Sequence, residues 1–263
     1  MKFLIQHNLM NTDSLSLVKN AVAPFPHEFV GLIPFSREIT SEIPLEGVDF
    51  IPYGSTLLTT LALDKGWTGL HFDLSVFNYE ASVKNRNDML NNDKIMSVEE
   101  AYQFMVNGMR GANQTWFIRP SEDSKHFAGQ VIEASECAAW LKDAMSLPPE
   151  SGTYAMSPDM KVVISRPRNI QAEWRWFVVG GKVIDGAMYK AHNQLVKKPE
   201  TDLNVIAEAQ SLADKWLPDS CVVMDTALVD GEVYVIEFNC IHSSGFYGHD
   251  VSKIFKALWE YHN

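Results

Sequence analysis

A carboxylate and an amide stand two positions apart at the end of an apolar run, residues 233–239. The run predicts a β-strand, in which side chains two positions apart share a face, so Glu237 and Asn239 should point to one spot. A second apolar run, residues 220–228, carries a single acid, Asp225. Carboxylate and amide oxygens are the kind of ligand that Mg²⁺ prefers. The three side chains are therefore a candidate metal site, and the alternative is a half-buried hairpin whose acids face water.

The turn between the two runs decides whether these side chains meet. A two-residue turn at residues 230–231 would pair Val229 with Glu232 and place Asp225 on the face opposite Glu237. A three-residue loop, with Gly231 in the left-handed conformation, would place both acids on one face. We predict the three-residue loop, because only this register lets the two acids share a ligand.

Residues 173–179 and 182–190 predict a second hairpin, joined by two glycines that favour a tight turn with Val179 paired to Lys182. Cations and an acid that share a sheet face with apolar neighbours lose hydration energy unless an anion or a partner satisfies them. Their convergence therefore suggests a ligand. The predicted register places Glu173, Arg175 and Lys190 on one face, and Trp174, Trp176 and Tyr189 on the other.

Another cation ends the strand predicted over residues 115–119, where Arg119 precedes a proline that takes the chain out of the sheet. The loop over residues 121–129 follows and contains hydroxyls, Lys125 and a glycine. Such a loop can wrap a polyphosphate with side-chain charge and backbone N–H groups. A polar hairpin loop with solvated charges is the alternative.

The first third of the chain alternates strands and helices. Strands are predicted over residues 2–6, 28–33, 48–52 and 69–73, and helices over residues 15–23 and 56–65. This alternation of strands and helices favours a parallel sheet with helices on its faces. Tyr53 and Ser55 follow one of these strands, at a strand end where open α/β sheets bind ligands, although these residues taken alone favour a plain turn.

The rest of the chain mixes strands and helices in a different order. A polar stretch over residues 85–94 is the candidate boundary between the two parts. Ser97 and Glu100 have the spacing of a capping box at the start of a helix. Strands are predicted over residues 115–119, 130–134 and 161–165 besides the two hairpins, and helices over residues 97–109, 136–145, 203–216 and 251–261.

Composition limits the possible functions. The chain has 263 residues and a formal net charge of −11, with 22 basic against 33 acidic residues, which argues against an extended nucleic-acid footprint. Its three cysteines match no zinc spacing and suggest a reducing compartment, and Cys240 is better explained as a buried thiol than as a nucleophile. No apolar run reaches the ~18 residues of a membrane span. We expect a soluble, cytoplasmic protein.

Together these motifs resemble the ATP-grasp superfamily, whose members clamp a nucleotide behind an N-terminal α/β domain. The resemblance covers roughly residues 97–250, and within the superfamily the chain resembles a phage and bacterial group of mostly uncharacterised proteins. It implies an α+β chain with an ATP-grasp fold. The implied parts are a Rossmann-like α/β domain over residues 1–95, a small ATP-grasp subdomain over residues 96–162, and a C-terminal ATP-grasp subdomain with the metal site over residues 163–263.

The resemblance also implies a role for each matching position. Arg119 stands where the family commonly has a phosphate-binding lysine, and it keeps the charge while changing the geometry of the contact. Ser165 ends a strand that resembles the adenine-binding hinge, where the family often has an acid. The remaining implied roles are Mg²⁺ binding by Asp225, Glu237 and Asn239, ribose binding by Glu173, phosphate binding by Lys125, and a clamp on the γ-phosphate formed by Arg175 and Lys190.

The implied reaction is ATP-dependent ligation of a carboxylate to an amine through an acyl-phosphate, with ADP and phosphate released. Amino acids or a peptide are among the possible substrates. The segments that should select them contribute Tyr53, Ser55, Ser243, Ser244 and Tyr247. Two alternatives stay open, a phosphotransferase with the same clamp and a nucleotide-binding phage protein without turnover. The sequence predicts neither the substrates nor the oligomeric state.

Overall fold

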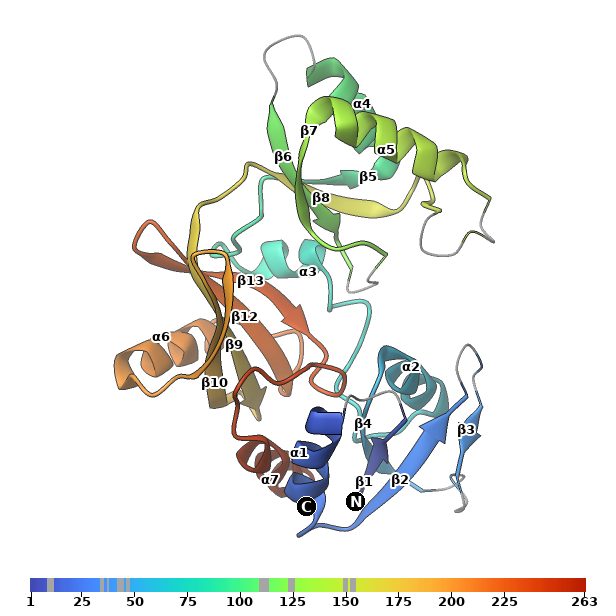
Figure 1. Cartoon of the computed structure of the whole chain (residues 1–263), viewed down its shortest axis with the longest axis vertical. Helices are drawn as coiled ribbons and strands as arrows, with labels where there is room; N and C mark the ends of the chain where they lie inside the picture. Colours follow the sequence, from blue (N-terminus) through green and yellow to red (C-terminus); the bar gives the residue numbers. More distant parts are fainter. Residues whose placement is uncertain are drawn as a thin grey trace. The chain divides into compact units, whose positions relative to one another are not determined.

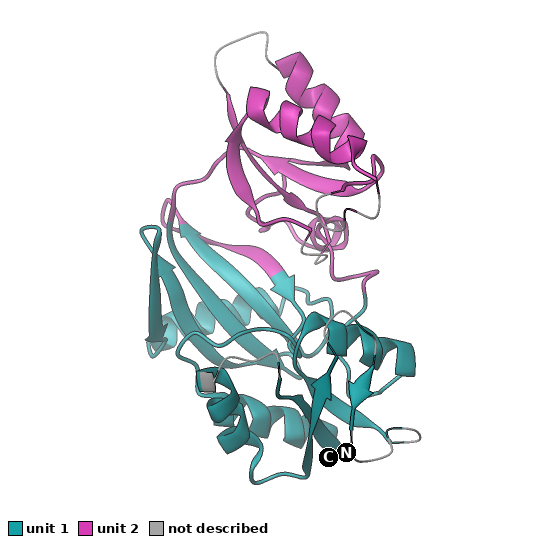
Figure 2. Ribbon diagram, turned by 45° about the vertical axis from the view of Figure 1, so that its right-hand side comes forward, with its two compact units in different colours: residues 1–73, 171–228, 238–263 teal, residues 74–170, 229–237 magenta. Residues whose placement is uncertain are grey.

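The computed structural model describes residues 1–8, 12–33, 36, 38–41, 45, 48–108, 114–122, 126–148, 151 and 155–263. The chain forms two compact units (Figure 2). The first contains Met1–Asp73, Gln171–Leu228 and Phe238–Asn263, and the second contains Leu74–Ile170 and Val229–Glu237. The division into an N-terminal domain and two ATP-grasp subdomains at residues 95 and 162 stays a prediction.

The first unit begins with a small, mostly parallel sheet. Its strand order is β3 (Ile39–Thr40), β2 (His27–Leu32), β1 (Lys2–Gln6), β4 (Phe50–Tyr53). β1 pairs in parallel with both β2 and β4; α1 (Thr12–Val22) connects β1 to β2, and α2 (Thr56–Lys65) follows β4. The predicted parallel β-α-β arrangement is confirmed, whereas the assignment of this part to a Rossmann-like domain stays a prediction.

The strand predicted over residues 69–73 is wrong. A turn forms here instead, in which the Leu70 amide donates to the Trp67 carbonyl at 3.2 Å. Gly69 lies so close to β4 that a Cβ atom at this position would be 2.3 Å from the carbonyl oxygen of Phe50. The apolar residues of this segment therefore pack against the sheet without joining it.

A five-stranded sheet follows, in the order β11 (Gln194–Pro199), β10 (Lys182–Ala191), β9 (Ile170–Val179), β12 (Val222–Val229), β13 (Glu232–Asn239). The tight Gly180-Gly181 turn is confirmed, since Val179 pairs with Lys182 and both glycines have positive φ angles. Edge strand β11 was not predicted, because most of its side chains are exposed and its sequence has no clear alternation of apolar residues.

The first unit has a core that joins its two sheets. Phe3 of β1, Phe177 of β9, Val223 of β12 and Phe255 of α7 (Val251–His262) belong to one buried cluster. Helices α1 and α7 pack against each other beside it (Figure 1). This shared core explains why the N-terminal sheet and the C-terminal part of the chain form one unit. Helix α6 (Leu203–Ala213) contacts β10.

The second unit is an antiparallel sheet covered by two helices (Figure 1). The strand order is β5 (Lys94–Ser97), β8 (Lys161–Ser165), β6 (Thr115–Pro120), β7 (Gln130–Glu133), and the helices are α4 (Val98–Gly108) and α5 (Ala134–Ser146). The predicted capping box is confirmed, because the Glu100 amide donates to Ser97 Oγ at 3.1 Å and the Ser97 amide donates to Glu100 Oε2 at 2.7 Å. Short elements β5 and α3 (Tyr79–Asn85) were not predicted.

Within the described ranges, no helix has both the length and the apolar character that crossing a bilayer requires. The three cysteines are buried free thiols.

Candidate functional site

The centre of the candidate site is an ion pair between neighbouring strands. Arg175 of β9 donates from Nε to Asp225 Oδ1 at 2.9 Å and from Nη2 to Asp225 Oδ2 at 2.7 Å. Asn239, the last residue of β13, donates from Nδ2 to Asp225 Oδ2 at 3.3 Å. The Asp225 side chain is 1% exposed and that of Arg175 is 12% exposed. The structure thus brings together a predicted phosphate-binding cation and two predicted metal ligands.

The route by which these residues meet differs from the prediction. β12 ends at Val229 and β13 begins at Glu232, and both Asp230 (φ 53°) and Gly231 (φ 87°) are left-handed, so the turn has two residues and the predicted three-residue loop is wrong. With strict alternation from this turn, Asp225 and Asn239 would lie on opposite faces. Their hydrogen bond therefore shows a departure from strict alternation between the turn and the site.

Glu237 precedes Asn239 by two positions on β13, so the strand directs both side chains to the same face. Within the second unit, Arg119 Nη2 of β6 lies 2.6 Å from Glu237 Oε2. The Arg119 guanidinium also lies 4.8 Å from the centre of the Tyr79 ring. Glu237, the third predicted metal ligand, is thus paired with Arg119, another predicted phosphate-binding cation. The Arg119 guanidinium in turn packs against an aromatic ring.

Glu173 receives two partners from β10. Lys190 Nζ lies 2.8 Å from Glu173 Oε1, and the Tyr189 hydroxyl donates to Glu173 Oε2 at 2.6 Å. The prediction that Tyr189 faces away from this acid is wrong, because the β9–β10 register shifts twice, between Val183 and Asp185 and between Met188 and Lys190. The two tryptophans do avoid this cluster: Trp174 donates to Glu200, and Trp176 donates to Thr226.

Two tyrosine rings support the Arg175 guanidinium. Its carbon lies 5.0 Å from the centre of the Tyr247 ring and 5.8 Å from that of Tyr189, and the two rings stack on each other. Burial would lower the pKa of Arg175, but Asp225 more than compensates and the pKa is raised. Arg175 is therefore a permanently charged group held in one orientation.

His249 fastens the loop after β13 to β9. Its Nδ1 accepts from the Tyr247 amide at 2.9 Å, so its Nε2 carries the proton and donates to the Arg175 carbonyl at 3.1 Å. Burial lowers the pKa of His249 to about 4, which keeps the ring neutral at pH 7. Sequence analysis missed His249, Tyr79 and the role of Tyr189, since these contacts depend on elements distant in sequence.

Two segments predicted to select substrates lie side by side in the first unit. The Tyr53 hydroxyl donates to the Ser244 carbonyl at 2.8 Å, and the Gly54 amide donates to the His242 carbonyl at 2.9 Å. His242 Nδ1 in turn donates to the Pro52 carbonyl at 2.8 Å. These bonds join the end of β4 to the loop that follows the Glu237–Asn239 strand end.

Several predicted substrate hydroxyls already support the backbone. Ser55 is the N-cap of α2, where its Oγ donates to Gln6 Oε1 at 2.8 Å and accepts from the Leu58 amide. Ser244 Oγ donates to the Cys240 carbonyl, and the Ser243 amide donates to the same carbonyl. Substrate contacts by these residues stay predictions.

The remaining predicted nucleotide contacts belong to the second unit. Ser165, at the end of β8, is fully buried and its Oγ donates to Asn91 Oδ1 at 3.1 Å. Lys125 lies outside the described residues.

A buried histidine cluster lies near the C-terminus. His71 Nδ1 donates to Asp219 Oδ1 at 2.7 Å, and His71 Nε2 lies 3.0 Å from His262 Nε2. Burial would lower the pKa of His71, but the hydrogen bond to Asp219 and the neighbouring Cys221 raise it to about 9. Burial and the charge of His71 lower the pKa of His262 to about 4. At pH 7 the pair therefore carries one positive charge, which lies on His71, and His262 is neutral.

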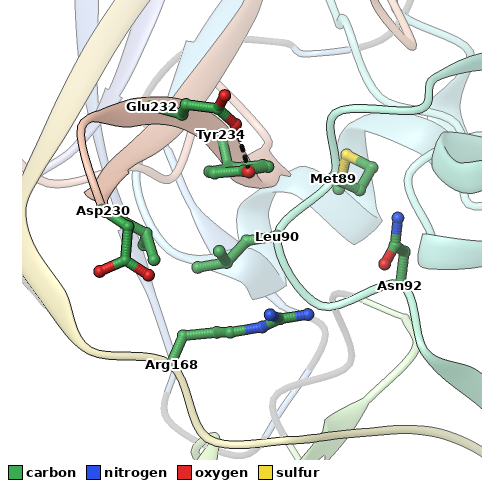
Figure 3. A pocket seen from close by; sticks show the side chains of 8 residues that line it. Met89, Leu90, Asn92, Arg168, Asp230, Glu232 and Tyr234 are labelled. Atoms are coloured by element: carbon green, nitrogen blue, oxygen red, sulfur yellow. Dashed lines mark hydrogen bonds between the residues drawn. The ribbon is translucent and has the colours of Figure 1, made fainter.

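The second unit also contains a cavity of about 330 Å³ (Figure 3). The Tyr234 hydroxyl donates to Glu232 at its wall, and Arg168 extends along the opposite side, below Leu90. No predicted site residue of the described ranges lines it. The lining residues are Met89, Leu90, Asn92, Arg168, Val229, Asp230, Glu232 and Tyr234.

The donor set at the strand ends has the chemistry of a hard-cation site. A carboxylate such as Asp225 and an amide oxygen such as that of Asn239 suit Mg²⁺ when substrate phosphates and water complete the shell, and a contribution from Glu237 stays a prediction. The described part of the chain contains no group of three or more His, Cys, Asp or Glu side chains arranged for a metal. A metal at the candidate site would therefore depend on the amide and on ligands from a substrate.

Comparison with solved structures shows the fold. A RimK domain ATP-grasp protein from Sphaerobacter thermophilus DSM 20745 has a TM-score of 0.63 at 15% identity, with 98% of this chain and 100% of that chain covered. The ATP-grasp ligase PsnB, complexed with minimal precursor, Mg and ADP, gives 0.55 at 12% identity over 98% and 97%. D-alanine–D-alanine ligase from Bacillus anthracis gives 0.56 at 10% identity over 99% and 98%.

Comparison with curated protein sequences gives no match. A family model, ATP-grasp domain, R2K clade family 3, matches residues 73–259, which is more than half of the chain. The predicted ATP-grasp fold, with its mixture of helices and sheets, is thereby confirmed, and the protein belongs to the R2K clade family 3 of ATP-grasp domains.

Proposed function

We propose that the protein uses ATP and Mg²⁺ to join a carboxylate to an amine, releasing ADP and phosphate. The observation that carries the proposal is the cluster of Arg175, Asp225 and Asn239, with Glu237 on the same strand face as Asn239. Family membership supports it, as do similar structures that include an ATP-grasp ligase bound to Mg and ADP and a D-alanine–D-alanine ligase.

In this proposal Asp225, Glu237 and Asn239 hold Mg²⁺. When bound, the ion neutralises charge on the phosphates and so favours phosphoryl transfer. Arg175 and Lys190 bind the γ-phosphate, and Arg119 with Lys125 binds the other phosphates. Because Arg175 is already oriented by two rings and a carboxylate, it needs little reorganisation to act as a fixed positive charge. Glu173 binds the ribose, and Ser165 lies at the adenine end.

The reaction has two steps. A carboxylate oxygen of the first substrate attacks the γ-phosphorus and the bond to the departing ADP oxygen breaks, which gives an acyl-phosphate. The amine then attacks the acyl carbon, the bond to the phosphate oxygen breaks, and the nitrogen loses a proton to give the amide. Positioning and charge neutralisation suffice for this chemistry, so no protein nucleophile is needed. Tyr53, Ser55, Ser243, Ser244 and Tyr247 are the candidate substrate contacts.

A screen of ADP release tests the proposal. Candidate acids, amines, amino acids and short peptides are supplied singly and in pairs with MgATP. The expected result is ADP and free phosphate only when a correct acid and a correct amine are both present. Equal ADP release without substrates contradicts the proposal. Labelled γ-phosphate that appears in a stable product instead of free phosphate identifies a phosphotransferase.

A further inference from the structure

The predicted metal ligand Asp225 has both carboxylate oxygens engaged by Arg175. The two contacts measure 2.9 and 2.7 Å, and Asn239 adds a third donor at 3.3 Å. The carboxylate is almost completely buried. We infer that Arg175 makes the site selective for a metal–nucleotide complex over the free metal ion, an inference that rests on the proposed function.

The free energy needed to bind a metal ion beside Arg175 without nucleotide is the reason for this selectivity. A divalent ion that shares Asp225 with the guanidinium lies beside a positive charge, and one that approaches along the present hydrogen-bond directions displaces a guanidinium contact. The displaced Arg175 would remain buried without a full counter-charge, and breaking one partner away from a buried pair is strongly unfavourable. Free metal should therefore bind weakly.

A triphosphate removes this cost. Its oxygens match the planar fork of a guanidinium, so they can replace the carboxylate as the partner of Arg175. Asp225 is then available to the metal. Each ligand makes the other's binding more favourable, and thermodynamic linkage requires the effect to be reciprocal.

The surroundings of Arg175 keep the guanidinium at the site during this exchange. The Tyr247 and Tyr189 rings lie against it, and its Nη1 donates to the Gly245 carbonyl at 3.3 Å. These contacts do not involve Asp225, so they persist when the carboxylate is lost as a partner. Arg175 therefore exchanges the Asp225 carboxylate for the triphosphate while its guanidinium stays at the site.

Mn²⁺ binding to the full-length protein, measured by electron paramagnetic resonance, tests the inference. Arg175→Gln should bind Mn²⁺ without nucleotide about tenfold more tightly than wild type, within the ~5–150-fold range usual for coupled sites. The same variant should bind AMPPNP, a non-hydrolysable triphosphate, more weakly in the presence of a chelator. These opposite signs distinguish the inference from general damage, which would weaken both.

A matched control is available in the second unit. Arg86 and Asp88 form a buried pair of the same geometry, with contacts of 2.7 and 2.9 Å. Arg86→Gln should leave both affinities at the wild-type values. Arg175→Lys, which keeps the charge but loses the fork, provides a second variant if the glutamine variant does not fold, and it should tighten Mn²⁺ binding by a smaller factor.

The outcomes separate the two proposals. Wild type that binds no AMPPNP with or without Mn²⁺ overturns the proposed function and this inference together. Wild type that binds Mn²⁺ with AMPPNP, while the Arg175 variants bind Mn²⁺ alone no more tightly than wild type, overturns this inference only.

Discussion

The hydroxyl of Tyr189 donates to Glu173 Oε2 at 2.6 Å, although strict alternation along β10 would put this tyrosine on the other face of the sheet. The register shift beside it lets both Tyr189 and Lys190 reach the same carboxylate. Glu173 is thus held by two partners, and the ring that holds it also supports Arg175. The two register shifts along β10, between Val183 and Asp185 and between Met188 and Lys190, therefore connect the predicted ribose contact to the predicted γ-phosphate contact.

Tyr189→Phe tests this connection, because it keeps the ring and removes the hydroxyl. Loss of one hydrogen bond to a charged group should raise the KM for ATP by roughly tenfold, or ~1.5 kcal/mol, and change kcat less. Steady-state kinetics with the substrates found in the ADP-release screen measure both constants. Tyr234→Phe is the control, since it removes a similar bond of 2.7 Å to Glu232 outside the predicted site. Equal effects of the two variants would contradict the assignment.

Glu237→Ala tests the metal assignment. Loss of a carboxylate ligand should reduce Mg²⁺-dependent ATP turnover by roughly two orders of magnitude, a loss typical of removing one charge-stabilising group. ADP release at saturating Mg²⁺ and ATP is the measurement. Glu232→Ala, an exposed position at the start of the same strand, should retain wild-type turnover. An active Glu237→Ala variant would remove this residue from the metal site.

The His71 cluster predicts a loss of stability in alkaline solution. The folded-state pKa of His71 is raised to about 9, above its unfolded value of ~6.5. Protonated His71 therefore stabilises the fold fully below pH ~6.5, and this contribution is lost as the pH rises through about 9. Urea unfolding between about pH 6 and about pH 9.5 should show wild type losing up to ~3 kcal/mol more than His71→Asn.

The exposed His7→Asn makes the same substitution outside the His71 cluster and serves as the control for this series. A His71→Asn variant whose free energy of unfolding runs parallel to that of wild type over the whole range would show that His71 carries no extra proton in the folded state.

Gly186→Ala should destabilise the five-stranded sheet. A Cβ atom at this position would lie 2.1 Å from Trp176 Cε3 and 2.2 Å from Cζ3, and the tryptophan is buried. Overpacking of this kind costs ~1–3 kcal/mol in the free energy of unfolding. Gly108→Ala, which meets no atom within 4 Å, should stay within ~0.5 kcal/mol of wild type. Urea denaturation measures both, and equal stabilities would show that Trp176 moves aside easily.

The sequence by itself determined the local features of this protein and its family. The capping box at Ser97, the tight Gly180-Gly181 turn and the parallel pairing of β1 are all confirmed. So is the ATP-grasp fold, which the family model supports over residues 73–259. These features depend on neighbouring residues or on a repeated pattern of apolar positions, and both can be recognised in the sequence alone.

Which side chains of the site contact one another depends on the tertiary structure. The two-residue turn at Asp230 suggests that Asp225 and Asn239 lie on opposite faces, yet they are hydrogen-bonded, and Tyr189 likewise contacts Glu173. A shift of one residue in strand pairing reverses every face beyond it and leaves no mark in the apolar pattern. Such shifts are selected by packing across the whole sheet, so the partners of a charged residue follow from the folded structure alone.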